Sequence, residues 1–517
     1  MRSLRPQPAV AMGIATAVSR ASGFARTVAL AGILGVTAVG DAYNTANTVP
    51  NMVFTLVVGG VLTSAVVPIL VEAHHSGHGT TGAANALLGG AIAIGMASSV
   101  AVALAAPFIV GVLTAGASSR SGYNEYASVT TTWLRWFAPQ IGLYAVGVLA
   151  VSIMTAQRRL FLGAAAPILT NLIVIAVVAA AAGRPGSVDV NALGAGTTLA
   201  VAAATAVQLW GARRTVPGLR PRWEPRHPAL TGIGKRAGWM LLYVAANQIG
   251  LIVVVAIATR TRGGVSAYQW AFTVMQLPYA LIAVSIVSAA YPAISEAAAT
   301  GSGAGRHVRD ASVSSLRLLV PAAAALALLA GPIAVVVVGS EGSGLVAAAL
   351  VGFALSLVPF TLFQLLTRVA YAHRDTRAPA GVNVAVNAFN IVAAILLVGA
   401  ARSASQSLTL LAVAHAGSYI VGVMVLGALL IHRRRLAASD LARGHRVTAV
   451  ATLAMSAAVW SVMREASGAE LDRAGAVTLC AGLTVLGAAV YSAATIAQRS
   501  LTARTARWRS AAALPEP

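Results

Sequence analysis

Residues 343–372 read SGLVAAALVGFALSLVPFTLFQLLTRVAYA, and Arg368 is the only charged side chain in this stretch. About 20 consecutive apolar residues suffice for an α-helix to cross the hydrocarbon core of a bilayer. Within lipid every backbone amide must find its hydrogen-bond partner inside its own segment, and a helix meets that condition. The stretch therefore predicts a membrane-spanning helix.

The composition of the whole chain agrees with this prediction. The protein has 517 residues, of which 58% are hydrophobic and 10% charged, and its mean hydropathy is +0.79. Soluble domains carry roughly 25% charged residues, so a large water-facing domain is excluded. A transmembrane β-barrel alternates polarity along short strands and has no apolar runs of this length. We therefore predict an all-α polytopic membrane protein.

Fourteen segments are apolar and long enough to span a bilayer, so we expect about 14 transmembrane helices. They lie near residues 10–34, 41–71, 85–114, 129–156, 163–183, 190–212, 237–259, 265–295, 313–339, 343–372, 379–401, 406–431, 447–463 and 474–496. The first segment is too long and too rich in arginine for a signal peptide, so we expect it to be retained. Prolines are expected to kink four of the longer segments, at Pro50, Pro139, Pro278 and Pro359.

The formal charge of +22 would suggest nucleic-acid binding in a soluble protein, but here it is better explained by membrane topology. With the N-terminus placed inside, the inner loops and tails hold 24 of the 36 basic residues, and the outer loops hold seven. Basic residues are enriched in cytoplasmic loops. The distribution predicts a multi-pass protein of the plasma membrane with both termini in the cytoplasm, and no nucleic-acid partner.

The chain also repeats itself. Residues 156–171 (AQRRLFLGAAAPILTN) and 372–387 (AHRDTRAPAGVNVAVN) share Ala, Arg and Asn at one constant offset. Both copies have the same expected orientation, so we predict a parallel repeat of two six-helix lobes with a transport pathway between them. The predicted parts are an N-lobe at 1–214, a basic cytoplasmic linker at 215–236, a C-lobe at 237–432, helices thirteen and fourteen at 447–496, and a cytoplasmic tail at 497–517.

The first predicted span contains two arginines, Arg20 and Arg26, beside Ser19. An arginine inside a bilayer costs several kcal/mol unless it faces a water-filled cavity or a partner. On an ideal helix the two lie about 120° apart, and long side chains can still converge on one cavity. The alternative is that they extend to the inner membrane surface, which is easier for Arg20 than for Arg26. We favour a cavity for both.

Other polar residues inside the spans have two interpretations each. Asp41 either caps the second helix or pairs with Arg26. Asn383, Asn387 and Asn390 recur at i, i+4 and i+7 and form a polar stripe, which either holds helices together or lies in the pathway. His415 is typical of a hydrogen-bonded interior histidine rather than a proton carrier.

The sequence contains no pattern that supports catalysis. It has no His/Glu zinc pattern, no glycine-rich phosphate loop and no paired carboxylates within a span. The single cysteine, Cys480, excludes a disulfide within the chain. We therefore expect no metal and no cofactor, and a protein that is not an enzyme. A transport cycle would have to draw on a gradient, the membrane potential or the substrate concentration.

Several motifs together resemble those of the MurJ/MviN family of lipid II flippases. They are Ser19-Arg20, Gly23-Phe24, Arg26, Gly35, Asp41-Ala42, Pro50-Asn51 and Pro68, followed by the stretches 137–140, 156–171 and 371–379. The resemblance extends over essentially the whole chain.

The resemblance implies the fold of the multidrug/oligosaccharidyl-lipid/polysaccharide exporter superfamily. It implies movement of the undecaprenyl-pyrophosphate-linked peptidoglycan precursor from the inner to the outer leaflet by alternating access. Arginines of a central cavity would attract the pyrophosphate, and the last two helices would form a groove for the lipid tail. By matching, Ser19, Arg20, Arg26, Asp41 and Asn51 would line or support this cavity. The implied partners are the lipid-linked glycan, membrane lipids and cell-wall synthesis enzymes.

The chain departs from the family pattern at two cavity arginines. Phe54 stands where one is expected, and Phe272-Thr273 stand where the family has an Asp-Arg pair. These departures leave two alternatives open. One is a flippase or exporter of another polyprenyl-linked glycan or of a small molecule. The other is a non-transporting scaffold for cell-wall enzymes.

Overall fold

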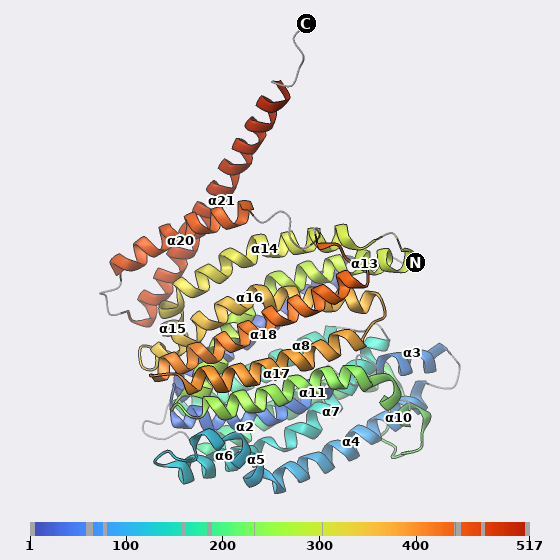
Figure 1. The fold of residues 1–517 in the computed structure, drawn as a ribbon. Coiled ribbons are helices and arrows are strands. Elements are labelled where there is room, and N and C mark those ends of the chain that lie inside the picture. Colours follow the sequence, from blue (N-terminus) through green and yellow to red (C-terminus); the bar gives the residue numbers. More distant parts are fainter. Residues whose placement is uncertain are drawn as a thin grey trace. The chain divides into compact units, whose positions relative to one another are not determined.

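The computed structural model describes residues 6–57, 66–75, 80–157, 159, 161–182, 189–231, 233–301, 303–438, 440, 446–466 and 471–511. Every regular element in these ranges is a helix (Figure 1). The prediction of an all-α polytopic membrane protein is confirmed.

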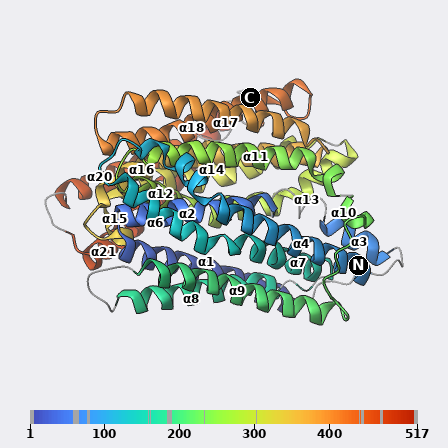
Figure 2. The ribbon, with the colours of Figure 1, turned by 90° about the horizontal axis from the view of Figure 1, so that it is seen from below.

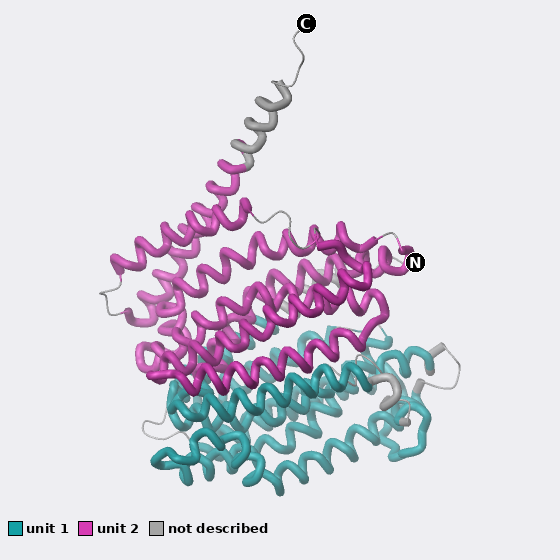
Figure 3. The backbone as a smooth tube through the Cα atoms, in the orientation of Figure 1, with its two compact units in different colours: residues 1–266 teal, residues 267–517 magenta. Residues whose placement is uncertain are grey.

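The chain divides into two compact units, residues 1–266 and 267–517 (Figure 3). The helices of unit 1 are α1 Pro6–Leu34, α2 Ala38–Thr55, α3 Val67–His75, α4 Thr80–Leu104, α5 Ala106–Leu113, η2 Ala115–Ala117, α6 Tyr123–Phe137, α7 Pro139–Ala156, α8 Phe161–Ala182, α9 Val190–Thr215, α10 Pro228–Thr231 and α11 Ile233–Ala258. Helix α12, Gly264–Pro278, begins in unit 1 and continues into unit 2.

The remaining helices belong to unit 2. They are η3 Tyr279–Ala283, α13 Val284–Thr300, α14 Gly305–Leu328, α15 Ala330–Val338, α16 Ser343–Ala372, α17 Arg377–Gly399, α18 Ala404–His432, α20 Arg446–Ala466 and α21 Arg473–Ala511. The predicted lobe boundaries rest on the sequence repeat, and they stay a prediction.

The prolines act differently from one span to the next. Pro139 separates α6 from α7, and Pro278 is followed by the π-helical turn η3. By contrast, α2 and α16 continue through Pro50 and Pro359. A proline removes one backbone donor and crowds the preceding turn, and the surrounding packing decides whether the helix is interrupted.

Within the part of the chain that the structure describes, twelve helices are long and apolar enough to cross a membrane. The first two predicted spans are not among them. Helix α1 lies partly outside the residues whose side chains are described, and α2 carries Asp41, Asn44, Asn47 and Asn51. The predicted total of 14 spans therefore stays a prediction, and the two helices in question are those that hold the polar candidate residues.

In unit 1, α1 packs against α8, and α8 packs against α9 (Figure 2). A second group of helices, α3, α4, α7 and α9, encloses a cluster of buried apolar side chains that includes Leu70, Leu88, Leu149 and Ile153. The contact with α8 holds α1, which carries Arg20 and Arg26, and α2, which carries Asp41, packs against α6 and α7.

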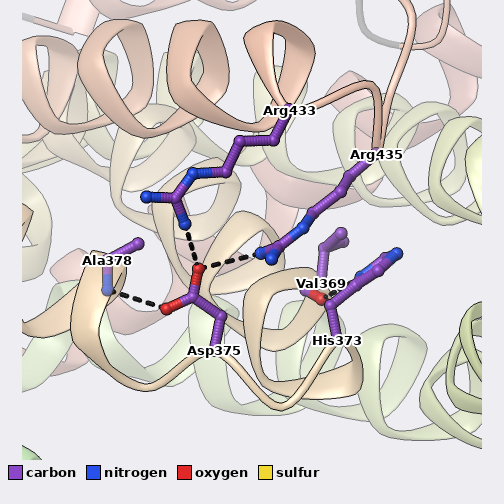
Figure 4. A network of polar contacts seen from close by, with 6 residues as sticks. All are labelled: Val369, His373, Asp375, Ala378, Arg433 and Arg435. Atoms are coloured by element: carbon purple, nitrogen blue, oxygen red, sulfur yellow. Dashed lines mark hydrogen bonds and ion pairs between the residues drawn. The ribbon is translucent and has the colours of Figure 1, made fainter.

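In unit 2, α16 packs against α18, and α17 packs against α18. The short turn between α16 and α17 is held by Asp375 (Figure 4). Asp375 Oδ1 accepts a hydrogen bond from the Ala378 amide at 3.0 Å, and Oδ2 pairs with Arg433 and, at 2.9 Å, with Arg435. The carboxylate thereby caps α17 and ties it to the end of α18.

The last two helices, α20 and α21, pack against each other and against α14 and α15. Leu329, Met455, Val459 and Leu483 form the buried centre of this contact. The Tyr491 hydroxyl also donates to the Arg317 carbonyl oxygen at 2.7 Å. The apolar groove that the family resemblance implies for these helices stays a prediction.

Candidate functional site

The first part of the candidate site is a clamp between α1 and α8. The Asn171 Nδ2 amide donates to the Ser22 hydroxyl at 2.9 Å and to the Ser19 carbonyl oxygen at 3.3 Å. The Ser22 hydroxyl in turn donates to the Ser19 carbonyl oxygen at 3.0 Å. Asn171 is buried, whereas Arg20, which follows Ser19, is largely exposed. The clamp fixes the turn of α1 from which Arg20 projects.

Arg26 lies further along α1 and is half-buried. Its Nε atom is buried, and it has no hydrogen-bond partner among the described residues. The guanidinium is within electrostatic range of the hydroxyl groups of Tyr43 and Tyr144. Tyr43 is held in place by edge-to-face contacts with Trp133 and Phe137, at ring distances of 5.5 and 5.3 Å. Arg26 therefore retains donor capacity beside an aromatic, hydroxyl-bearing wall.

Asp41 makes different contacts from either of the two that the sequence suggested. Its Oδ2 accepts from the Gly263 amide at 2.7 Å, and its Oδ1 accepts from the Ser266 amide at 2.9 Å. Helix α2 is capped by Thr37 instead, whose hydroxyl accepts from the Gly40 amide at 3.1 Å. Asp41 is fully buried and caps the start of α12, a helix that is remote from it in the sequence.

Two further contacts complete this junction, which we call the Asp41 latch: Asp41, Asn44, Gly263 and Ser266. The Asn44 Nδ2 amide donates to the Ser266 hydroxyl at 3.0 Å. Gly263 has a φ of +77°, and a Cβ atom there would come within 2.4 Å of the Val36 side chain. Only glycine meets both conditions at low cost, so the loop before α12 can bring its amide to Asp41.

The remaining predicted site residue of unit 1, Asn51, lies in α2 with an exposed side chain. Three residues further on, Phe54 packs against Tyr144 with ring centroids 4.9 Å apart. The position at which the family resemblance leads one to expect an arginine is thus occupied by an aromatic contact between α2 and α7.

The asparagine stripe of α17 lies in unit 2. Asn383 and Asn390 are buried and Asn387 is half-buried, and the Asn387 side-chain amide donates to the Asn383 carbonyl oxygen at 2.9 Å. These facts do not decide between helix contact and pathway, so both interpretations remain.

His415 on α18 is surrounded by aromatic rings. Its ring centroid is 5.0 Å from that of Tyr419, 5.5 Å from that of Phe353 and 5.7 Å from that of Phe272. Its Nε2 atom is buried and has no hydrogen-bond partner among the described residues. The sequence predicted a hydrogen-bonded histidine, and for Nε2 this prediction is wrong. Phe272, at the position where the family resemblance leads one to expect an acidic residue, packs against Phe353 and His415 in this aromatic cluster.

Four residues of the site were not predicted from the sequence: Asn171, Asn44, Gly263 and Ser266. Asn171 carried a signal, because it recurs at Asn387 in the repeat. Gly263 and Ser266 carried none, because their importance depends on their contact with Asp41. Among the described residues, no group of three His, Cys, Asp or Glu side chains is placed to hold a metal ion.

The chain matches a family model described as "Lipid II flippase MurJ" over residues 30–473. Among curated proteins it is similar to the "Probable lipid II flippase MurJ" of Rhizobium meliloti (strain 1021). The two are 31% identical over 398 residues, which is 73% of this chain and 72% of the relative.

Solved structures show the same fold. A structure described as "Lipid II flippase MurJ, inward closed conformation" matches with a TM-score of 0.77 and 19% identity, over 95% of this chain and all of that one. An inward-facing multidrug resistance MATE family transporter of the MOP superfamily matches with a TM-score of 0.64 and 14% identity, over 81% of this chain and 96% of that one. Since the family model covers most of the chain and the curated relative is 31% identical to it, the chain belongs to the MurJ family of lipid II flippases.

Proposed function

We propose that the protein moves lipid II, the undecaprenyl-pyrophosphate-linked peptidoglycan precursor, from the inner to the outer leaflet by alternating access. Membership of the family supports the substrate class. The observation that carries the proposal is the pair of arginines on α1, with Arg20 exposed and Arg26 holding a buried Nε atom that no described residue uses. The cycle involves no covalent step.

Arg20 and Arg26 bind the pyrophosphate in this proposal. A guanidinium presents a planar fork of donors that matches phosphate oxygens and stays charged at any physiological pH. The Asn171 clamp holds the α1 backbone at Ser19 and Ser22, so the charge is presented from a fixed turn. Ser19 and Asn51 are proposed to support the same cavity.

The Asp41 latch supplies one of the states of the cycle. When Asp41 accepts from both Gly263 and Ser266, α2 is locked to the start of α12. We propose that this contact closes the outer end of the pathway and must break before release. Asp41 is thus a gate residue that supports the cavity rather than one that touches the substrate.

A depletion experiment tests the proposal. The host's own lipid II flippase is depleted, this chain is expressed in its place, and lipid II exposed on the outer leaflet is assayed. We expect exposure to be restored by the wild-type chain and lost in Arg20→Ala and Arg26→Ala. Arg135→Ala, a change of the same kind at the end of α6, is the matched control and should retain function. Full exposure in both α1 variants would refute the binding role of the arginines.

A second candidate function is transport of another polyprenyl-linked glycan. The Phe54–Tyr144 contact favours it, because an aromatic pair replaces a cation in unit 1. The rate at which the purified chain flips lipids in vesicles would be measured for lipid II and for a polyprenyl-pyrophosphate that carries a different sugar. Faster flipping of the second lipid would favour this candidate, and flipping of neither would favour a non-transporting scaffold.

Both termini are proposed to lie in the cytoplasm, as the distribution of arginines predicts. Cell-wall synthesis enzymes are proposed as partners, because they make the substrate on one side and consume it on the other. Crosslinking the chain in intact cells, followed by identification of the captured enzymes, tests this; capture of none would remove them from the proposal.

A further inference from the structure

A pocket lies in unit 1, and neither Arg20 nor Arg26 is among the residues that line it. It has a volume of about 600 Å³, which is within the range of small-molecule sites. Its walls come from the start of α2 at Ala38 and Ala42, from the segment 117–129, and from Arg262 in the loop before α12. By the predicted topology this is the outer end of the unit.

The charged groups of the pocket favour an anion. Arg120 donates from one guanidinium nitrogen to the Thr259 carbonyl oxygen at 2.7 Å, which leaves further N–H donors on its fork. Arg262 is exposed, and no ion pair or hydrogen bond of its side chain occurs among the described residues. Of the described residues that line the pocket, Glu125 is the acidic one. Asp41 lies within electrostatic range of Arg120, and both of its carboxylate oxygens accept from the Gly263 and Ser266 amides.

The start of α6 adds partial positive charge to the same pocket. Gly122, at a φ of +78°, precedes the helix and offers no side chain to cap its first amides. Tyr123, Glu125 and Tyr126 of this first turn line the pocket. The Tyr123 amide donates to the Arg120 carbonyl oxygen at 3.2 Å. The amides that follow it in the first turn, together with two guanidinium groups, form a donor set suited to phosphate oxygens.

Two of the three walls of the pocket, α2 and the loop before α12, are joined by the Asp41 latch. Ala38 and Ala42 lie close to Asp41 on α2, and Arg262 immediately precedes Gly263, which donates to Asp41. Arg120 is anchored to Thr259 in the same loop, and the Tyr126 hydroxyl lies 3.2 Å from the Thr45 hydroxyl on α2. A ligand that contacts both α2 and the loop before α12 loses contacts when these two segments separate.

We propose that this pocket binds a phosphate-bearing anion and that the bound anion stabilises the closed Asp41 latch. The anion contacts Arg120, Arg262 and the first turn of α6. A ligand that binds the closed arrangement more tightly than the open one shifts the equilibrium toward closure by its difference in affinity. The phosphate could be supplied by a soluble anion or by a lipid headgroup of the outer leaflet.

The binding test uses the purified full-length chain in nanodiscs of phosphatidylcholine, titrated with inorganic pyrophosphate by calorimetry. We expect saturable binding that Arg262→Gln weakens by about fivefold and Glu125→Gln tightens by about twofold, in line with single partly exposed charges. Arg260→Gln removes an equal charge two residues away, outside the pocket lining, and should change the affinity less than twofold. Equal weakening in Arg260→Gln and Arg262→Gln would show a diffuse surface effect and overturn the proposal.

The coupling test measures hydrogen–deuterium exchange of the peptide that contains residues 259–266. Pyrophosphate should slow exchange in the wild type and in Arg260→Gln, and leave it unchanged in Arg262→Gln. The same slowing in nanodiscs that contain phosphatidylglycerol, without pyrophosphate, would assign the phosphate to a lipid headgroup; slowing by pyrophosphate alone would assign it to a soluble anion. No slowing under either condition would overturn the proposal.

Discussion

Asn171 and Asp41 each join helices that are far apart in the sequence. Asn171 uses one side-chain amide to hold two groups of α1, and Asp41 uses both carboxylate oxygens to hold two amides at the start of α12. In an apolar environment a buried polar group that loses its partner finds no water to replace it, and this costs free energy. Small polar side chains can therefore decide the position of whole helices here.

We predict that Asn171→Ala lowers the unfolding free energy by about 1–2 kcal/mol, because two hydrogen bonds to α1 are lost. Thermal unfolding of the purified chain in detergent measures this. The control is Asn191→Ala, since Asn191 accepts from the Trp136 indole at the surface. An unchanged midpoint in Asn171→Ala would mean that α1 is held by apolar packing alone.

We predict a graded loosening of the latch in Asp41→Asn and Asp41→Ala. Asparagine keeps one acceptor oxygen for the two amides, and alanine keeps none. Exchange of the Gly263 and Ser266 amides with deuterium should be faster in Asp41→Asn than in the wild type, and faster again in Asp41→Ala. Wild-type exchange in Asp41→Ala would show that these amides are protected by burial and not by the carboxylate.

At the scale of the elements, the chain combines uninterrupted helices with helices that are joined by short, fixed turns. The turn between α16 and α17 has Arg374 at a φ of 57°, and the turn after α18 has Arg434 at a φ of 55°. Asp375 joins the two turns: it accepts from the Ala378 amide in α17 and pairs with Arg433 and Arg435 in the turn after α18. One carboxylate thus offsets the conformational cost of two tight turns.

We predict that Asp375→Asn destabilises unit 2 by about 1–2 kcal/mol at pH 7, with the exposed Glu341→Gln as control. Burial alone would raise the pKa of Asp375, but the Ala378 amide and the two arginines lower it below its ordinary value of 3.8. Folding therefore favours the ionised form, and its contribution is present above about pH 4 and is lost as the pH falls through the folded pKa.

Thermal unfolding at several pH values measures this contribution. The difference between the wild type and Asp375→Asn should be constant from pH 7 to pH 5 and shrink at lower pH. A difference that grows on acidification would contradict the assigned direction of the pKa.

At the scale of the whole molecule, both units are built mainly from long helices of apolar composition. Contacts within each unit use small residues, as where a Cβ atom at Gly95 would come within 2.8 Å of the Gly142 backbone. Close approach of backbones replaces the hydrophobic effect, which is weak between helices in lipid. The specific arrangement of the helices within each unit then rests on the few polar contacts described above.

The orientation of the chain gives a prediction at this scale. In a Cys480→Ser background, a cysteine at Arg377 should react with a membrane-impermeant thiol reagent only when the inner surface is accessible. A cysteine at Arg402, at the other end of α17, should react from outside in intact cells. Reversed labelling of the two sites would place the termini outside and refute the predicted topology.

The class of the protein and the location of many of its helices could be predicted from the sequence alone. The length of the apolar runs requires helices in lipid. Pro139, which was expected to kink the fourth span, lies where α6 ends and α7 begins. The family was recognisable because Ser19, Arg20, Arg26 and Asp41 occur at fixed spacings along the first two helices. Apolar runs, prolines and motif spacings can be read from the order of residues along the chain, and lipid as the solvent decides what structure they form.

Only the tertiary structure decided what the polar residues contact. Asp41 was expected to cap its own helix or to meet Arg26, and it caps α12 instead. Phe54 was known only as a missing arginine, until its contact with Tyr144 gave it a packing role. The physical reason is the same for both: a hydrogen bond or a ring contact is set by distance in space, and partners so far apart along the chain leave no local pattern to read.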